Sequence, residues 1–297
     1  MKGLKVAVVG LVRGYPQNNR LYIPLIKRNN SIYNNINKLR DNKVDVVLFH
    51  EGNISKIDED YIKSESLESL KFINVSKYFQ TNLLKLNEGD KFSLGYRQMC
   101  RFNMFHIWNE VADYDYILRA DEDVEITKFD PNIFEYMELK NITFLTGRFS
   151  KEIHKKTNAT LPMYLKDNTE LDVDKIYNHK FPYTNLYASK VAFWRKEDVT
   201  TLLKKIALSD DQLINRWGDI PVLGGMLNHK QEKINLFPKL EYQHISHDLV
   251  IKNNFFRNLT INSKFNPVSI NEGITKKIIL RIKAKISKNN KYDFRNH

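Results

Sequence analysis

Cysteines and long apolar runs are both scarce in this chain of 297 residues. The single cysteine, Cys100, excludes an intramolecular disulfide framework. No stretch approaches the roughly 18 consecutive apolar residues of a membrane-spanning helix. The short apolar run over residues 6–10 is followed by Arg13 and has no small-residue cleavage site nearby, so it is not typical of a signal peptide. We therefore expect a cytoplasmic protein that is at most peripheral to a membrane surface.

Positive charge is in excess, because 47 Lys and Arg against 35 Asp and Glu give a net charge of +12. Such an excess suits a nucleic acid, a phosphorylated substrate or an anionic membrane. No helix-turn-helix, zinc-finger or RNA-binding signature is present. Residues 275–297 hold eight Lys or Arg and one acid, so this segment carries +7 and the rest of the chain +5. We therefore expect no nucleic-acid partner. The alternative is that the protein binds a nucleic acid through this basic segment.

Strands and helices alternate in the first part of the chain. Residues 5–11 (KVAVVGL), 44–50 (VDVVLFH) and 71–75 (KFINV) are apolar runs typical of strands covered on both faces. A helix is predicted over 21–39, with Pro24 in its first turn. This alternation predicts an α/β fold with a mostly parallel sheet. Further strands are predicted over 114–120, 143–146 and 188–194, and further helices over 95–111, over 199–208 and from Pro221.

The C-terminal segment has a different pattern. Isoleucines recur every four residues over 274–286, with Lys or Arg between them, which predicts a basic amphipathic helix. We therefore predict one domain over residues 1–273 and a basic tail over 274–297. The tail either packs its isoleucine stripe on the domain or makes a peripheral contact with an anionic membrane.

An acidic cluster follows the predicted strand over 114–120. That strand ends directly in Asp121, Glu122 and Asp123, and ligands of open α/β sheets bind at the carboxyl ends of strands. Asp121 and Asp123 are two residues apart, so on an extended chain they point the same way. They can hold one divalent cation, which in turn can neutralise a nucleotide diphosphate. Taken alone, the pair also fits a solvated acidic turn.

Two later segments add candidate site residues. Residues 216–222 (RWGDIPV) put Asp219 at the start of a predicted helix, where it is either a site residue or a helix N-cap. Residues 242–248 (YQHISHD) contain His244, and neutral imidazole is a good ligand for ions such as Mn²⁺.

Together these segments resemble the fungal-type α-1,2-mannosyltransferases of glycosyltransferase family 15. That family has a Tyr-x-x-Met-x-Arg-Phe helix, a strand ending in Glu-Pro-Asp, an Arg-Trp-Gly-Asp-x-Pro-Val motif and a Tyr-x-His motif. All four occur here in the same order, and the resemblance covers roughly residues 5–250. The matching segments are residues 96–102, 121–123, 216–222 and 242–244.

The resemblance implies a GT-A fold, with a mixed, mostly parallel sheet and helices on both faces. It also implies Mn²⁺ or Mg²⁺, a nucleotide-sugar donor (GDP-mannose is favoured), a glycan acceptor and retention of anomeric configuration. By position, Asp121, Asp123 and His244 match the family's metal site. Asp219 matches its active-site aspartate, and Tyr96 a tyrosine near the transferred sugar.

Four more residues are expected at the donor, together with Asp121. Arg13 and Glu51 follow the first two strands and are expected near the nucleotide. Arg97 and Arg101 are expected to offer positive charge to phosphates, although either also fits a charge on the surface of a helix.

Two positions depart from the family. Glu122 replaces its Pro, and Tyr187 replaces the Glu of its Asn-Phe-Glu segment. Tyr187 is expected to face the sugar, but it cannot act as a carboxylate nucleophile. Either the alignment slips at this position, or the transfer proceeds without that nucleophile, or the donor sugar is not mannose. A retaining transfer can still proceed by front-face attack, in which the leaving phosphate accepts the acceptor's proton. The chain begins almost at its first strand, whereas the fungal enzymes have an N-terminal anchor. Either a cytosolic bacterial or viral relative or an excised catalytic region is expected, and Met1 favours the former.

The sequence therefore predicts a metal-dependent, retaining glycosyltransferase that moves a hexose, with mannose suggested. A UDP-sugar transferase is the alternative for the donor. A third possibility is a catalytically inactive member of the family that acts as a scaffold. Tyr187 is the only residue that supports this possibility.

Overall fold

The computed structural model describes residues 3–16, 18–81, 92–170, 172–173, 177 and 180–244. All of them belong to one compact unit, Met1–His247. The predicted tail over 274–297 lies outside the described residues, so its helix and the domain boundary at residue 273 stay predictions. Among the described helices, none has both the length and the apolar composition needed to cross a membrane.

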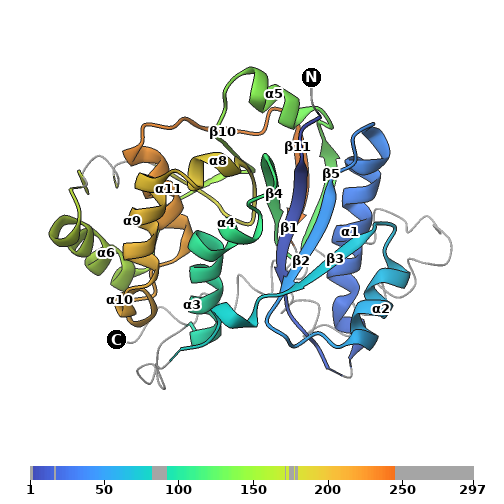
Figure 1. The fold of residues 1–297 in the computed structure, drawn as a ribbon, viewed down its shortest axis with the longest axis horizontal. Coiled ribbons are helices and arrows are strands. Elements are labelled where there is room, and N and C mark those ends of the chain that lie inside the picture. Colours follow the sequence, from blue (N-terminus) through green and yellow to red (C-terminus); the bar gives the residue numbers. More distant parts are fainter. Residues whose placement is uncertain are drawn as a thin grey trace, which may run out of the picture. The chain divides into compact units, whose positions relative to one another are not determined.

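A seven-stranded sheet forms the centre of the unit (Figure 1). In order across the sheet, its strands are β10 (Ile234–Leu236), β6 (Phe144–Thr146), β9 (Leu186–Lys190), β4 (Tyr116–Ala120), β1 (Val6–Val12), β2 (Asp45–His50) and β3 (Leu70–Asn74). β9 runs antiparallel to both of its neighbours, and every other neighbouring pair is parallel. The sheet is therefore mixed and mostly parallel, as predicted.

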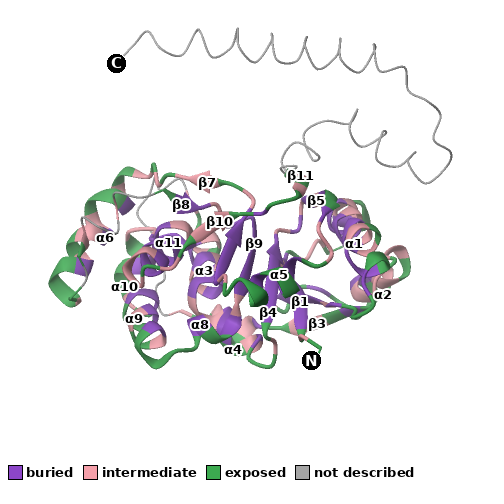
Figure 2. Cartoon of the chain, turned by 90° about the horizontal axis from the view of Figure 1, so that it is seen from above, coloured by how far each residue is buried: buried purple, intermediate pink, exposed green. Residues whose placement is uncertain are grey.

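Alternate residues along the central strands enter two separate cores. On β1, Ala7 and Val9 pack with helices on one face, whereas Val6 and Val8 pack with helices on the other. The central strands are consequently buried on both sides (Figure 2), which explains their continuous apolar sequences. The first face is covered by α3 (Leu94–Arg101), α4 (Ile107–Glu110), α9 (Glu197–Ala207) and α11 (Asp219–His229), and the second by α1 (Ile23–Asn35), α2 (Lys56–Glu65) and α5 (Ile133–Leu139).

Three predicted elements differ in the structure. The helix predicted over 21–39 is divided into η1 (Asn19–Tyr22), α1 and η2 (Asn37–Leu39), because the backbone leaves the helical region at Ile36. The helix predicted over 95–111 contains a π-helical turn, η4 (Phe102–His106), between α3 and α4. The strand predicted over 188–194 is wrong beyond Lys190: α8 (Val191–Trp194) is a helical turn whose buried Trp194 stacks on Trp108 at 4.8 Å.

The sequence did not predict a small antiparallel ribbon beside the main sheet. β5 (Val124–Phe129) pairs with β11 (Leu240–His244), with Val124 opposite His244. This pairing carries His244 back to the end of β4. Other elements without a prediction are η3 (Ser76–Tyr78), β7 (Phe149–Ser150), α6 (Lys155–Asn168), β8 (Phe181–Pro182) and α10 (Asp210–Ile214).

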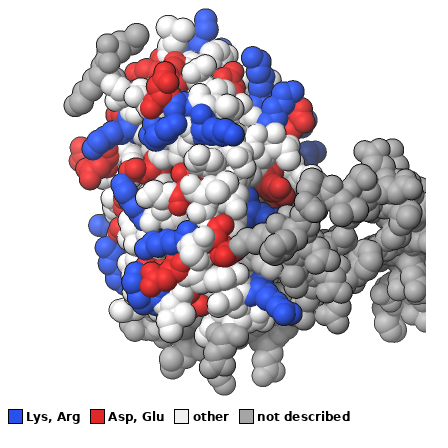
Figure 3. All heavy atoms as spheres, turned by 90° about the vertical axis from the view of Figure 1, so that its right-hand side faces the viewer, with Lys and Arg blue, Asp and Glu red and all other residues white. Residues whose placement is uncertain are grey.

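The alternation of strands and helices predicted a helix between β2 and β3 without giving its bounds, and α2 is that helix. Its start has a clear local cause. The Ser55 hydroxyl accepts a hydrogen bond from the Asp58 N–H, and the Asp58 carboxylate accepts one from the Ser55 N–H, which is a capping box. The face of the molecule at α1 and α2 carries interspersed acidic and basic side chains (Figure 3). The pair between Lys56 and Asp60 at 2.9 Å is one example.

Candidate functional site

The acidic cluster lies at the carboxyl end of β4, near the middle of the sheet. The Asp121 N–H donates to the Asn185 carbonyl at 2.9 Å, so the turn is tied to the segment before β9. Below it, the fully buried Arg28 donates to the carbonyls of Ala120 at 3.3 Å and Val9 at 3.1 Å. Burial lowers the pKa of Arg28 to about 10, which leaves it charged at neutral pH. These contacts fix the main chain from which the predicted metal ligands project.

The ribbon of β5 and β11 brings His244 to this cluster. Its Nε2 lies 3.1 Å from Oδ1 of Asp123. This hydrogen bond raises the pKa of His244, and the charges of Asp123 and Asp121 add to the effect. The structure thus joins Asp123, the last acid of the cluster, to a histidine that is remote in sequence, as the motif resemblance implied.

A buried arginine connects the cluster to Asp219. Arg119, in β4, donates from Nη1 to Oδ2 of Asp219 at 2.7 Å and from Nη2 to Oδ1 of Asp121 at 2.8 Å. The side chains of Arg119 and Asp219 are 5% and 7% exposed, so this contact is shielded from water. Burial raises the pKa of Asp121 to about 6; Arg119 opposes this, while Asp123 and Asp219 add to it. Arg119 thus pairs with two of the carboxylates at this edge of the sheet, Asp121 and Asp219.

Arg119 was missed in the sequence, although a signal was available. It interrupts an apolar strand sequence, YILRA, and a buried arginine needs an acidic partner. Asp121 is two residues further on, and period two puts both side chains on one face.

Asp219 is held by the start of α11. Gly218 is the N-cap and Asp219 is the first helical residue, so the N-cap alternative for Asp219 is wrong. Its carboxylate binds Arg119 instead of capping its own helix. The preceding Trp217 is buried and donates from its indole nitrogen to Thr160 at 2.9 Å, which anchors the approach to the helix.

Tyr96 lies on α3 and is positioned by Arg216. Nη2 of Arg216 donates to the Tyr96 hydroxyl at 3.1 Å, while Nη1 binds the Glu152 carboxylate at 3.2 Å. Arg216 adopts a left-handed backbone conformation with φ of 57°, which is uncommon for a residue other than glycine. Burial raises the pKa of Tyr96, and the charge of Asp219 adds to this rise.

Tyr187 lies in β9, next to Arg119 of β4. It is opposite Arg119 in the pairing of β9 with β4, and its ring centre is 5.9 Å from the Arg119 guanidinium carbon. The side chain is fully buried and stacks on Phe144 at 4.9 Å. Tyr187 therefore packs against Arg119 inside the protein, and its side chain is not exposed at the surface.

Arg13 and Glu51 lie at the ends of β1 and β2, as expected. The Arg13 N–H donates to the Glu122 carboxylate at 2.9 Å, and its Nε lies 3.4 Å from the same group. Burial raises the pKa of Glu51, whereas the charge of Arg13 lowers it. Arg13 thus contacts Glu122 of the acidic cluster, and its charge also acts on Glu51.

Comparison with known proteins gives distant relatives of one kind. No family model matches the sequence. O-glycoside α-1,2-mannosyltransferase homolog 3 of Schizosaccharomyces pombe is 27% identical over 185 residues, which cover 52% of this chain and 47% of that protein. Probable mannosyltransferase KTR3 of Saccharomyces cerevisiae is 24% identical over 172 residues, covering 51% and 43%. The chain spans about half the length of these curated relatives.

Solved structures agree with the sequence comparison. Core-mannan synthase A (CmsA/Ktr4) from Aspergillus fumigatus, in its Mn/GDP form, superposes with a TM-score of 0.65 and 18% identity, covering 82% of this chain and 75% of that one. Ktr4p of S. cerevisiae in complex with GDP gives a TM-score of 0.63 and 16% identity, covering 81% and 71%. The chain is a divergent relative of the fungal mannosyltransferases. Its fold is GT-A, as the motifs predicted.

Two arginines that the family motifs suggested for phosphate binding do not join the cluster. Arg97 is buried and donates from Nη1 to the carbonyls of Leu213 and Ile214 at 2.6 and 2.9 Å. Arg101 donates to the Gln212 side chain at 2.9 Å and to the Ser209 carbonyl at 3.1 Å. These contacts place both guanidinium groups against α10 and its flanks, so we give them a structural role.

The metal ligands that the motif resemblance predicts are Asp121, Asp123 and His244. Within the described parts of the chain, no three His, Cys, Asp or Glu side chains are grouped closely enough to hold a metal ion as they stand. However, Asp123 and His244 already touch, and Asp121 is oriented by Arg119. Two carboxylates and an imidazole suit Mn²⁺.

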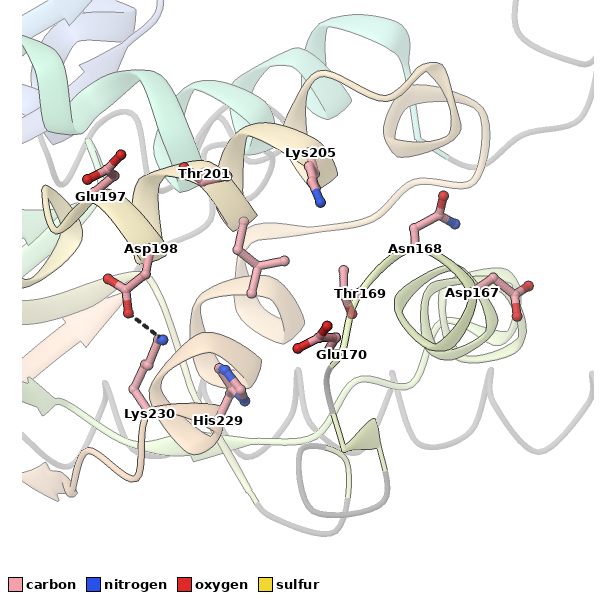
Figure 4. Close-up of a pocket in the computed structure, with 11 residues that line it drawn as sticks. Asp167, Asn168, Thr169, Glu170, Glu197, Asp198, Thr201, Lys205, His229 and Lys230 are labelled. Carbon is pink, nitrogen blue, oxygen red and sulfur yellow. Dashed lines mark hydrogen bonds and ion pairs between the residues drawn. The ribbon is translucent and has the colours of Figure 1, made fainter.

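A large cavity lies elsewhere, beyond the far end of α11 (Figure 4). It has a volume of about 1040 Å³ and is lined by the end of α6, the outer side of α9 and the end of α11. Lys230 and Asp198 pair across it at 2.5 Å. Asp219 and His229 are at opposite ends of α11, which separates the cavity from Asp219 by about 15 Å at 1.5 Å per residue.

Gly147 controls how closely β11 approaches the main sheet. A Cβ at this position would lie 2.8 Å from both Cε1 and the hydroxyl oxygen of Tyr242. We expect Gly147→Ala to lower the free energy of unfolding by about 1–3 kcal/mol, because Tyr242 and its strand must move. Gly95→Ala is the matched control, since its Cβ meets nothing within 4 Å. Equal stabilities of the two variants in urea titrations would contradict this packing.

Proposed function

We propose that this chain is a metal-dependent, retaining glycosyltransferase that moves a hexose from a nucleotide-diphosphate sugar to a glycan acceptor, with GDP-mannose as the favoured donor. The observation that carries the proposal is the convergence at the carboxyl end of β4. There, Asp123 meets His244 at 3.1 Å and Asp121 meets Arg119 at 2.8 Å. A structural relative with the same fold was solved with Mn and GDP, which supports this choice of ligands.

The residues of the cluster have separate roles in this proposal. Asp123 and His244, with the second oxygen of Asp121, would hold the cation, which neutralises charge on the leaving diphosphate. Arg13 and Glu51 would contact the nucleotide from the ends of β1 and β2.

Asp219 and Tyr96 would contact the transferred sugar or the acceptor. Arg119 fixes the carboxylate of Asp219 through a bond of 2.7 Å, and Arg216 fixes the hydroxyl of Tyr96 through one of 3.1 Å. Tyr187 carries a phenol and no carboxylate, and it is buried against Arg119, so it is not a nucleophile for the sugar. The proton of the acceptor hydroxyl would therefore go to an oxygen of the leaving phosphate, by front-face attack.

A thermal-shift panel of nucleotide sugars, each with and without Mn²⁺, tests this function. A ligand at 100 times its Kd stabilises the fold by about 2.7 kcal/mol, which corresponds to a rise of roughly 5–10 °C in Tm. We expect GDP-mannose with Mn²⁺ to give the largest rise, and UDP-sugars a smaller one. The proposal is wrong if no nucleotide sugar raises Tm in the presence of Mn²⁺ or Mg²⁺.

We further propose that residues 274–297 make a peripheral contact with an anionic membrane. Their sequence combines an isoleucine stripe with basic residues. Deleting 275–297 should abolish co-sedimentation with phosphatidylserine vesicles and leave nucleotide-sugar binding unchanged. Vesicle binding that survives the deletion would remove this role from the tail.

A further inference from the structure

Arg148 is an exposed cation at the rim of the acidic cluster. It follows Gly147 in the turn after β6, and its carbonyl accepts hydrogen bonds from the Tyr183 N–H and the Thr146 hydroxyl, both at 2.9 Å. Its guanidinium carbon lies 3.9 Å from the centre of the Tyr183 ring. The main chain is therefore fixed, and the guanidinium group rests on the face of the Tyr183 ring.

The position of Tyr183 brings this guanidinium towards the proposed metal ligands. The Tyr183 ring lies edge-on to the His244 imidazole, with 6.3 Å between ring centres. The guanidinium carbon is consequently no more than the sum of these two distances, about 10 Å, from the imidazole centre. A diphosphate bound at His244 and Asp123 would lie within reach of a long, extended arginine side chain.

The other arginines at this edge are already engaged. Arg119 binds Asp121 and Asp219, Arg28 binds main-chain carbonyls, and Arg13 lies against Glu122. In contrast, no salt bridge joins Arg148 to an acid within the part of the chain that the structure describes. A guanidinium stacked on an aromatic ring keeps its fork of donors available for a phosphate group.

We propose that Arg148 binds the diphosphate of the nucleotide sugar and stabilises it as the leaving group, an inference that rests on the proposed function. In the transfer, the bond between the sugar's C1 and the β-phosphate oxygen breaks, and its electron pair stays on that oxygen. The acceptor hydroxyl oxygen bonds to C1, and its proton passes to the phosphate. Negative charge therefore grows on the diphosphate, and a positive contact made there favours the transition state over the ground state.

Calorimetric titration of GDP and GMP, with UDP and UMP in parallel, tests this role in the full chain with Mn²⁺. We expect Arg148→Ala to weaken diphosphate binding by about 10- to 100-fold, since a charge-assisted hydrogen bond is lost, and to change monophosphate binding less than threefold. Arg148→Lys should restore part of the loss. Arg195→Ala is the control. Arg195 is also an exposed arginine, but it follows α8 and donates to the carbonyl of Trp108 in α4 at 3.2 Å, so its loss should leave diphosphate binding unchanged.

The possible outcomes separate the two proposals. If wild type binds neither GDP nor UDP, the proposed function fails and the role of Arg148 fails with it. If wild type binds a diphosphate and Arg148→Ala binds it equally well, only the role of Arg148 is overturned. Equal weakening of diphosphate and monophosphate binding would also overturn it, because the contact would then not be with the terminal phosphate of the diphosphate.

Discussion

Asp123→Asn is expected to lower sugar transfer by at least about 10²- to 10³-fold, because a cation that stabilises the leaving diphosphate contributes several kcal/mol. Asp123 is the acid in contact with His244, and its side chain is only 11% exposed. The amide keeps the shape of the side chain but removes the charge that a divalent cation requires. We expect the Mn²⁺-dependent part of nucleotide binding to disappear in the same variant.

The measurement is initial-rate kinetics with GDP-mannose and a glycan acceptor, combined with GDP titration with and without Mn²⁺. Asp113→Asn is the matched control, because this exposed acid precedes the other end of the same strand. It should keep wild-type rates. Full activity of Asp123→Asn, or a loss of equal size in the control, would show that the cluster does not hold the cation.

Arg119→Met is expected to lower the free energy of unfolding by about 3–5 kcal/mol, the usual cost of removing one partner of a buried ion pair. The Arg119 side chain is 5% exposed and is the contact that joins Asp121 to Asp219. Without it, two carboxylates at the edge of the sheet lose their positive partner. Asp219 would also lose the bond that orients it, so activity should fall along with stability.

A double-mutant cycle in urea separates this effect from simple loss of packing. Arg119→Met combined with Asp219→Asn should be less destabilised than the sum of the two single variants, since the second change removes a buried charge left unpaired by the first. Arg13→Met is the control: the Arg13 side chain is 65% exposed, so its pair with Glu122 should contribute less than about 1 kcal/mol. An Arg119→Met variant within 1 kcal/mol of wild type would contradict the central position of this arginine.

The sequence predicts the parallel part of the sheet because those strands are buried on both faces. Runs such as VAVVGLV in β1 have no polar face, are rich in β-branched valine and are followed by Gly and Pro, which together favour a buried strand. The ribbon of β5 and β11 was not predicted, since its partners are far apart in sequence and its residues are half-exposed. Val191–Trp194 was taken for a strand because a short apolar run does not distinguish a strand from a buried helical turn.

In the candidate site too, residues with a local sequence pattern could be predicted, whereas those whose contacts depend on distant parts of the chain could not. Asp121 and Asp123 are recognisable because local spacing places them together at a strand end. Arg97 and Arg101 are not distinguishable from phosphate-binding residues in sequence, because their actual partners are backbone carbonyls and a glutamine more than 100 residues away. Arg148 had no motif to mark it, and only its stacking on Tyr183 beside His244 makes it a candidate.

The most direct test is the release of GDP from GDP-mannose in the presence of a glycan acceptor, with the anomeric configuration of the product determined by NMR. We expect release with Mn²⁺, no release after excess EDTA, and a product that keeps the α configuration of the donor. Release that persists unchanged in EDTA, an inverted product, or no nucleoside diphosphate released from any donor with Mn²⁺ would contradict a metal-dependent, retaining transferase.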